Sequence, residues 1–180
     1  MSQIVILSGP PGAGKSSVCE ALCERYDRTV HIETDRFFDA IRMGRIDPMR
    51  PESDAQNRMV TRAAARAATA YAPDLYAVFI DGVIGPHLLP IYLDELRPAG
   101  VPVHFVLLMP SLEATLARVR SRPSDLQMAT REHRELHRQF ERYGSFAGLT
   151  VDNSALTAQQ TADVVMDACG RGACLAWSPE

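Results

Sequence analysis

Short apolar runs recur along the chain and predict buried β-strands. The first run, at residues 3–8, is continuously apolar, which is typical of a strand covered on both faces. It leads directly into a glycine-rich turn, and a later run at 76–80 ends at Asp81-Gly82. The pattern predicts five strands, at 3–8, 29–33, 76–80, 101–109 and 149–152.

Between these runs, apolar residues recur at the three- to four-residue spacing of amphipathic helices. The pattern predicts helices at 15–25, 35–43, 54–71, 86–96, 112–122, 130–143 and 157–169. The segments 45–53 and 123–127 have loop composition. We expect a weakly ordered tail at 170–180, with Trp177 as a possible anchor. Strands that alternate with helices indicate an α/β fold with a parallel sheet in three layers.

Length and composition are those of one ordinary globular domain. The chain has 180 residues, 46% of them hydrophobic and 23% charged, and a chain of this size buries roughly 70% of its unfolded surface. We therefore expect one domain over 1–180, with a lid around 118–135 and an acceptor-side segment around 35–72.

Charge and hydropathy narrow the range of partners. A net charge of -3 provides no global positive field for nucleic acid. No apolar stretch approaches the roughly 20 residues that cross a bilayer, and the N-terminus lacks the basic region and cleavage site of a signal peptide. We expect a cytoplasmic protein that binds neither nucleic acid nor membranes. These features do not define its oligomeric state.

The segment GPPGAGKS, at residues 9–16, fits the phosphate-binding pattern G-x-x-x-x-G-K-[ST] at every fixed position. It lies between a predicted strand and a predicted helix, which is the context that the motif requires. Gly12 and Gly14 allow backbone N–H groups and the positive end of the helix to point at an anion. Lys15 then reaches the β and γ phosphates as a catalytic residue, and the Ser16 hydroxyl suits Mg²⁺.

We therefore expect a nucleoside triphosphate, ATP or GTP, to be the phosphoryl donor, with Mg²⁺ as cofactor. The expected nucleotide-binding residues are Gly9, Pro10, Pro11, Gly12, Ala13, Gly14, Lys15, Ser16 and Ser17.

Two aspartates follow predicted strands, where ligands gather in open parallel sheets. The Asp35 carboxylate can accept the proton of an attacking hydroxyl as a catalytic base, or it caps the helix that begins beside it. Asp81 has the position of a Walker B acid, which orients Mg²⁺ through water or hydrogen-bonds Ser16. Its alternative role is in a structural turn.

Arginines can stabilise the charge of a moving phosphoryl group. Arg118 and Arg122 precede the loop at 123–127, so they are candidate catalytic residues of a closing lid, although a solvated helix face is the alternative for each. Arg36, Phe38 and Arg58 are the further expected acceptor-binding residues, together with Asp35 and Asp81.

Histidines and cysteines receive no chemical role. His133 and His137 are four residues apart on a predicted helix, but no H-E-x-x-H frame surrounds them, and we expect an exposed or lid-facing pair. The lone histidines are interpreted as hydrogen-bonding residues. They are His31, His87 and His104. The four cysteines lack C-x-x-C spacing and are interpreted as reduced packing residues.

With these residues in place, the chain resembles the small P-loop kinases of the nucleoside-monophosphate-kinase-like group, which include shikimate, gluconate and chloramphenicol phosphotransferases. It is also similar to a set of AAA-type bacterial kinase-like proteins in GRIDP at 44–48, QNRM at 56–59 and IDGVIGP at 80–86. The resemblance spans most of the domain and implies the sheet order 2-3-1-4-5. Asp35 matches the aspartate that acts as base on the drug hydroxyl in chloramphenicol phosphotransferase.

The resemblance implies transfer of a γ-phosphate to a small-molecule hydroxyl, with a resistance-type enzyme acting on a nucleoside-containing antibiotic as the specific candidate. The shikimate-binding arginine and glycine pattern and the gluconate-kinase lid signature are not evident, so the acceptor stays open.

Two other functions share the phosphate-binding motif. A nucleoside, nucleotide or metabolite kinase is the first, and a grip on an acceptor phosphate would require an arginine cluster such as Arg36, Arg42, Arg45 and Arg58. A regulatory nucleotide switch is the second, and it has no need of a hydroxyl-activating base such as Asp35.

Overall fold

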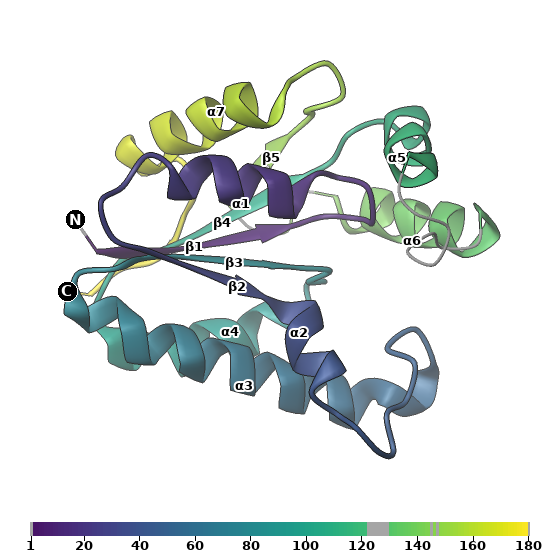
Figure 1. The fold of residues 1–180 in the computed structure, drawn as a ribbon, viewed down its shortest axis with the longest axis horizontal. Coiled ribbons are helices and arrows are strands. Elements are labelled where there is room, and N and C mark those ends of the chain that lie inside the picture. The colour runs from purple at the N-terminus through teal and green to yellow at the C-terminus, as the bar shows by residue number, and fades with distance from the viewer. Residues whose placement is uncertain (1, 122–129, 145, 147, 180) are drawn as a thin grey trace.

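The computed structural model describes residues 2–121, 130–144, 146 and 148–179, and it shows a twisted sheet between two layers of helices (Figure 1). Five parallel strands lie side by side in the order β2-β3-β1-β4-β5. They are β1 (Gln3–Ser8), β2 (Thr29–Glu33), β3 (Ala77–Gly82), β4 (Val103–Leu108) and β5 (Leu149–Val151). The α/β class and the order 2-3-1-4-5 are confirmed.

Helices cover both faces of the sheet, as the continuous apolar strands require. α1 and α7 pack on one face, and α3 and α4 pack on the other (Figure 1). The helices are α1 (Lys15–Cys23), α2 (Thr34–Asp39), α3 (Asp54–Tyr71), α4 (Leu89–Leu96), α5 (Leu112–Arg120), α6 (Thr130–Tyr143) and α7 (Ala158–Gly170). Among the described residues, no helix has the length and apolar character needed to cross a bilayer.

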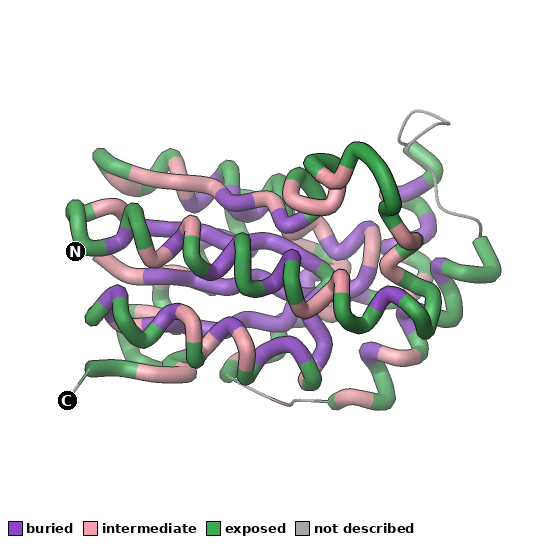
Figure 2. Tube along the Cα trace, turned by 90° about the horizontal axis from the view of Figure 1, so that it is seen from below, coloured by how far each residue is buried: buried purple, intermediate pink, exposed green. Residues whose placement is uncertain are grey.

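The alternation of side chains along β1 divides the core into two layers. Ile4 and Ile6 pack in the layer that holds the α3 and α4 side chains, whereas Val5 and Leu7 pack with those of α1 and α7. Figure 2 shows the buried residues concentrated along the strands and on the helix faces turned toward them. The strand ends that carry the motifs are therefore held on a rigid frame.

The expectation of a weakly ordered tail is wrong. Residues Leu175–Trp177 form β6, which pairs antiparallel with β4 at Val103 and His104. The three-residue strand β5 pairs only with Val106–Leu108, so it leaves the first half of that edge of β4 to β6. Trp177 packs against the core from this strand, in the anchoring role expected for it.

Helix α2 is shorter than predicted. It ends at Asp39 instead of residue 43, and Ile41 N donates to Phe38 O at 3.1 Å in a closing turn. Three short 3-10 turns begin at or next to a proline, where a helix can start without the missing N–H. They are η1 (Pro51–Ser53), η2 (Ala72–Asp74) and η3 (Arg97–Ala99).

Candidate active site

The phosphate-binding motif forms a tight backbone loop between β1 and α1. Gly12 and Gly14 have φ angles of 77° and 88°, a region that other residues rarely adopt. A Cβ on Gly12 would also lie 2.6 Å from the carbonyl oxygen of Thr115. Gly14 is the N-cap of α1 and forms no side-chain cap, so the first N–H groups of the helix are available to an anion.

Lys15 begins α1 and folds over this loop. Its Nζ donates to the carbonyl oxygens of Gly9 and Pro10, at 3.0 and 3.2 Å. The ammonium is thereby held at the rim of the loop, the position from which it can reach the terminal phosphates of a bound nucleotide.

Asp81, at the end of β3, is held by neighbours on β2 and α2. His31 Nε2 lies 3.0 Å from Asp81 Oδ2, and Thr34 Oγ1 donates to the Asp81 carbonyl oxygen at 2.6 Å. Burial raises the pKa of Asp81, but hydrogen bonds from His31 and Ser16 and the charge of Lys15 outweigh burial and lower it overall. Asp81 is therefore ionised at neutral pH.

The hydroxyl of Ser16 and the carboxylate of Asp81 are the hard oxygen ligands that Mg²⁺ prefers. Ser16 helps to lower the pKa of Asp81, and Asp81 carries its charge at neutral pH. These two residues therefore fit a site for Mg²⁺, in the roles expected from the sequence.

Asp35 lies in the first turn of α2 and lines the cavity beside the phosphate loop. The N-cap of α2 is Glu33, with no side-chain cap, so capping does not explain Asp35. Burial of the carboxylate raises the pKa of Asp35, and the negative charges of Asp81 and Asp39 raise it further. The positive charge of Lys15 lowers this pKa, but the net effect is an increase. A raised pKa suits a base that must accept a proton near neutral pH.

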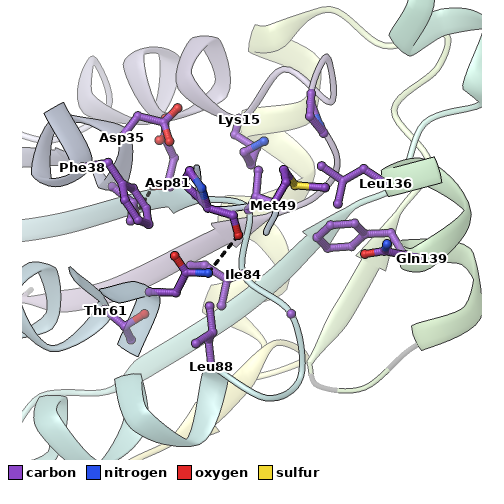
Figure 3. A pocket seen from close by; sticks show the side chains of 18 of the residues that line it. Lys15, Asp35, Phe38, Met49, Thr61, Asp81, Ile84, Leu88, Leu136 and Gln139 are labelled. Carbon is purple, nitrogen blue, oxygen red and sulfur yellow. Dashed lines mark hydrogen bonds between the residues drawn. The ribbon is translucent and has the colours of Figure 1, made fainter. Parts of the chain in front are cut away.

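Lys15, Ser16, Asp35 and Asp81 line one cavity of about 460 Å³. Figure 3 shows Lys15, Asp35 and Asp81 gathered at one end, and Leu136 and Gln139 of α6 across from them. The expected residues that line the cavity are Pro11, Gly12, Gly14, Lys15, Ser16, Asp35, Phe38 and Asp81. The loop after β3 forms its floor and is fixed by Ser8, whose Oγ donates to Ile84 O at 2.7 Å and accepts from Ile84 N at 3.0 Å.

Other expected residues do not line this cavity. Arg36 is 73% exposed and pairs with Glu33, and Arg58 pairs with Asp54 on the same helix. Gly9, Pro10, Ala13 and Ser17 belong to the phosphate loop and the first turn of α1 without lining the cavity wall.

Arg118 contacts the phosphate loop from outside the cavity. Its guanidinium donates to Gly12 O and Ala13 O at 3.5 and 3.3 Å, and to Asn153 O at 2.8 Å. Asn153 Nδ2 also donates to Ala13 O at 3.0 Å. Arg118 thus connects α5, the phosphate loop and the turn after β5. Arg122 and the loop at 123–127 in the expected lid lie outside the described residues.

His133 and His137 were expected to be exposed or to face the lid, and the first of these alternatives is wrong. Both are buried, His133 beside the Thr115 hydroxyl at 2.9 Å and His137 beside the Pro110 carbonyl at 2.9 Å. They fix α6 against α5 and the end of β4. This anchoring matters for the site because α6 supplies the far wall of the cavity, through residues Leu136, Gln139, Phe140 and Tyr143.

Sequence reasoning missed three contributors to the site, namely His31, Asn153 and the far wall from α6. In β2, His31 pairs in register with Phe79, and this places it on the same side as Asp81, two residues further along β3. Strand register would have revealed this contact. No local signal announces the other two.

Comparison with known families agrees with this geometry. Residues 4–143 match the family model described as an AAA domain. The match covers most of the chain, so this protein belongs to that family of P-loop domains.

Solved structures share the fold across nearly the whole chain. The tunicamycin resistance protein of Deinococcus radiodurans superimposes with a TM-score of 0.67 at 20% identity, covering 100% of both chains. The APS kinase of Mycobacterium tuberculosis gives 0.65 at 18% identity, covering 94% of this chain and 98% of that one. The shikimate kinase of Acinetobacter baumannii gives 0.64 at 18% identity, covering 96% and 94%. No curated protein sequence matches the chain.

Proposed function

We propose that this protein is a phosphotransferase that moves the γ-phosphoryl group of a nucleoside triphosphate to a hydroxyl of a small molecule. One observation carries the proposal: Lys15 of the phosphate loop and Asp35 beyond the next strand line the same cavity. A phosphate grip and a candidate base thus face one space, which a hydroxyl acceptor can enter.

Each residue has a defined part in this reaction. The N–H groups of the phosphate loop and the Lys15 ammonium hold the β and γ phosphates. Asp35 accepts the hydroxyl proton as the acceptor oxygen bonds to the γ phosphorus and the bond to the bridging oxygen breaks, which releases the nucleoside diphosphate. Ser16 and Asp81 would hold Mg²⁺, which supplies neutralising charge for the phosphates.

The finer proposal is a resistance-type enzyme that phosphorylates an antibiotic hydroxyl, with ATP or GTP as donor. Its support is the fold shared with a tunicamycin resistance protein over the whole chain and the position of Asp35. The APS and shikimate kinases share the fold equally well, so a metabolite kinase is the alternative.

A screen for the acceptor tests the proposal. The protein is incubated with Mg²⁺ and either ATP or GTP and a panel of hydroxylated metabolites, nucleosides and antibiotics, and mass spectrometry detects the gain of a phosphoryl group. Asp35→Asn should lower transfer by about 100-fold to 10,000-fold and leave nucleotide affinity nearly unchanged. The matched control is Asp39→Asn on the same helix, because Asp39 pairs with Arg45 and does not line the cavity. Transfer that survives Asp35→Asn contradicts the proposal.

A further inference from the structure

The charge of the cavity wall restricts the acceptor. Among the described lining residues, Lys15 and His87 are the only basic side chains, and Lys15 lies at the phosphate end. Three carboxylates line the same space, those of Asp35, Asp47 and Asp81. At the end of the cavity away from the phosphate loop, the described residues therefore offer no arginine or lysine to an anionic group.

Four arginines of α2, of α3 and of the segment between them pair with carboxylates. Arg45 Nη1 lies 2.8 Å from Asp39 Oδ1, and Arg66 Nε lies 2.8 Å from Glu95 Oε2. Arg36 and Arg58 likewise pair with carboxylates of their own segments. None of these four lines the cavity. Of the arginines expected to grip an acceptor phosphate, Arg36, Arg45 and Arg58 are thus paired away from the described cavity wall, and Arg42 does not line it.

Apolar side chains from three separate segments face the cavity instead. Phe38 comes from α2, Met49 from the loop before α3, and Leu136 from α6 (Figure 3). Ile84 and Leu88 add the floor, from the loop after β3. Met49 is 43% exposed, so it presents apolar surface that a ligand would cover. Such walls favour the flat or ring-shaped body of an amphipathic molecule.

The remaining hydrogen-bonding side chains of the acceptor end are largely neutral. Asn57 and Thr61 project from α3, and Gln139 projects from α6. Amide and hydroxyl groups can bind hydroxyls or ring nitrogens of a ligand without compensating a charge. An anion placed here would lie beside Asp35 and Asp47, with no arginine or lysine of the described wall at this end to compensate its charge, an arrangement that opposes binding.

We propose that the acceptor is an uncharged or cationic hydroxyl compound with an apolar ring system, and not a compound that carries a phosphate or a free carboxylate group. This inference rests on the proposed function, since it assumes that the cavity beyond Asp35 receives the acceptor. It predicts that nucleosides and aromatic or glycosidic alcohols bind, whereas nucleotides and hydroxy acids do not. Shikimate and APS, the ligands of two proteins that share the fold, belong to the excluded class.

Matched pairs of compounds test the charge rule directly. Equilibrium binding is measured in the presence of Mg²⁺ and a non-hydrolysable ATP analogue, for nucleosides against their 5′-monophosphates and for methyl esters against their free acids. At least one neutral member should bind about 100-fold more tightly than its anionic partner. Equal or tighter binding of the anionic members, or binding of neither member of any pair, overturns the inference.

A change of wall charge supplies the second test. Gln139 is only partly buried and lines the cavity, so Gln139→Arg adds a cation opposite the phosphate end, and Gln139→Met is the neutral control. The arginine variant should bind the anionic partner about tenfold more tightly, with no gain in the methionine variant. No gain for the arginine variant contradicts the inference.

Transfer is assayed separately with the unmodified protein, ATP and the neutral compounds that bind. Neutral ligands that bind yet receive no phosphoryl group would refute the proposed function while the charge rule stands. Anionic ligands that bind and are phosphorylated would refute the charge rule while the function stands.

Discussion

The imidazole of His31 on β2 lies against the carboxylate of Asp81 on β3, with Nε2 3.0 Å from Oδ2. Burial lowers the pKa of His31, but the hydrogen bond and negative charge of Asp81 outweigh burial and raise it. The contact joins two adjacent strands at the edge of the sheet where the candidate site lies. His31 therefore orients the carboxylate that faces Ser16, without itself lining the cavity.

Replacement of His31 should raise the Mg²⁺ concentration that nucleotide binding requires. His31→Ala frees the Asp81 carboxylate to rotate, so the Mg²⁺ concentration needed for nucleotide binding should rise about tenfold to 100-fold, as for other residues that orient a metal ligand. A Mg²⁺ titration of nucleotide binding measures the effect. His31→Gln, which retains a donor, should restore part of the response. An unchanged Mg²⁺ requirement in His31→Ala contradicts the orienting role.

The fall of the transfer rate at low pH should follow the protonation of Asp35. A base must be ionised to accept a proton, and the pKa of Asp35 is raised above its ordinary value of 3.8. Transfer should therefore fall as the pH is lowered through this raised pKa, while Asp81, with its lowered pKa, stays ionised. Transfer efficiency and nucleotide affinity are measured over the same pH range. An acid limb at or below 3.8, or a parallel loss of nucleotide binding, would argue against Asp35 as the base.

Lys15→Ala should weaken the binding of triphosphate and slow turnover. A charge-assisted hydrogen bond contributes about 1.5–3 kcal/mol, which corresponds to a loss of affinity of roughly tenfold to 100-fold. The nucleoside monophosphate lacks the phosphates that Lys15 reaches, so its affinity should change little. Calorimetric titration of both nucleotides compares them. Unchanged triphosphate affinity and turnover would contradict the phosphate-binding assignment.

Arg118→Ala should destabilise the fold around the phosphate loop. The guanidinium donates to three carbonyl groups, and leaving such groups unpaired costs about 2 kcal/mol, which lowers the Tm of a chain of this size by about 4–8 °C. Arg97→Ala removes only an exposed ion pair with Asp94 and should shift the Tm by much less. Thermal unfolding measures both variants. A lower rate of transfer at unchanged Tm would instead favour the catalytic role expected from the sequence.

The phosphate loop could be predicted from the sequence because its chemistry is local. Three glycines, a lysine and a serine within residues 9–16 set the backbone path and the start of α1. Asp35 and Asp81 were also accessible, since each follows a strand directly and parallel strand ends meet at one edge. The roles assigned to them remain predictions, and the structure adds their shared cavity.

Long-range contacts were not accessible in this way. Arg36 and Arg58 were placed near the acceptor by helix position alone, whereas their side chains pair with Glu33 and Asp54. Both pairs join residues three or four positions apart, a spacing at which helix side chains are neighbours, and the choice between this local partner and the cavity depends on the rotamer. The exposure expected for His133 and His137 was also not predictable, because their burial depends on Thr115 and Pro110 in another part of the chain.

By itself, the sequence determined the α/β alternation, the phosphate loop and the two strand-end aspartates, because apolar periodicity and turn chemistry act over a few residues. Only the tertiary structure decided that His31 contacts Asp81, that β6 pairs with the edge of β4, and that α6 forms a wall of the cavity beside the phosphate loop, with no arginine among the described lining residues. Those features depend on strand register and on packing between segments that are distant in the chain. Local sequence patterns predict neither the register nor this packing.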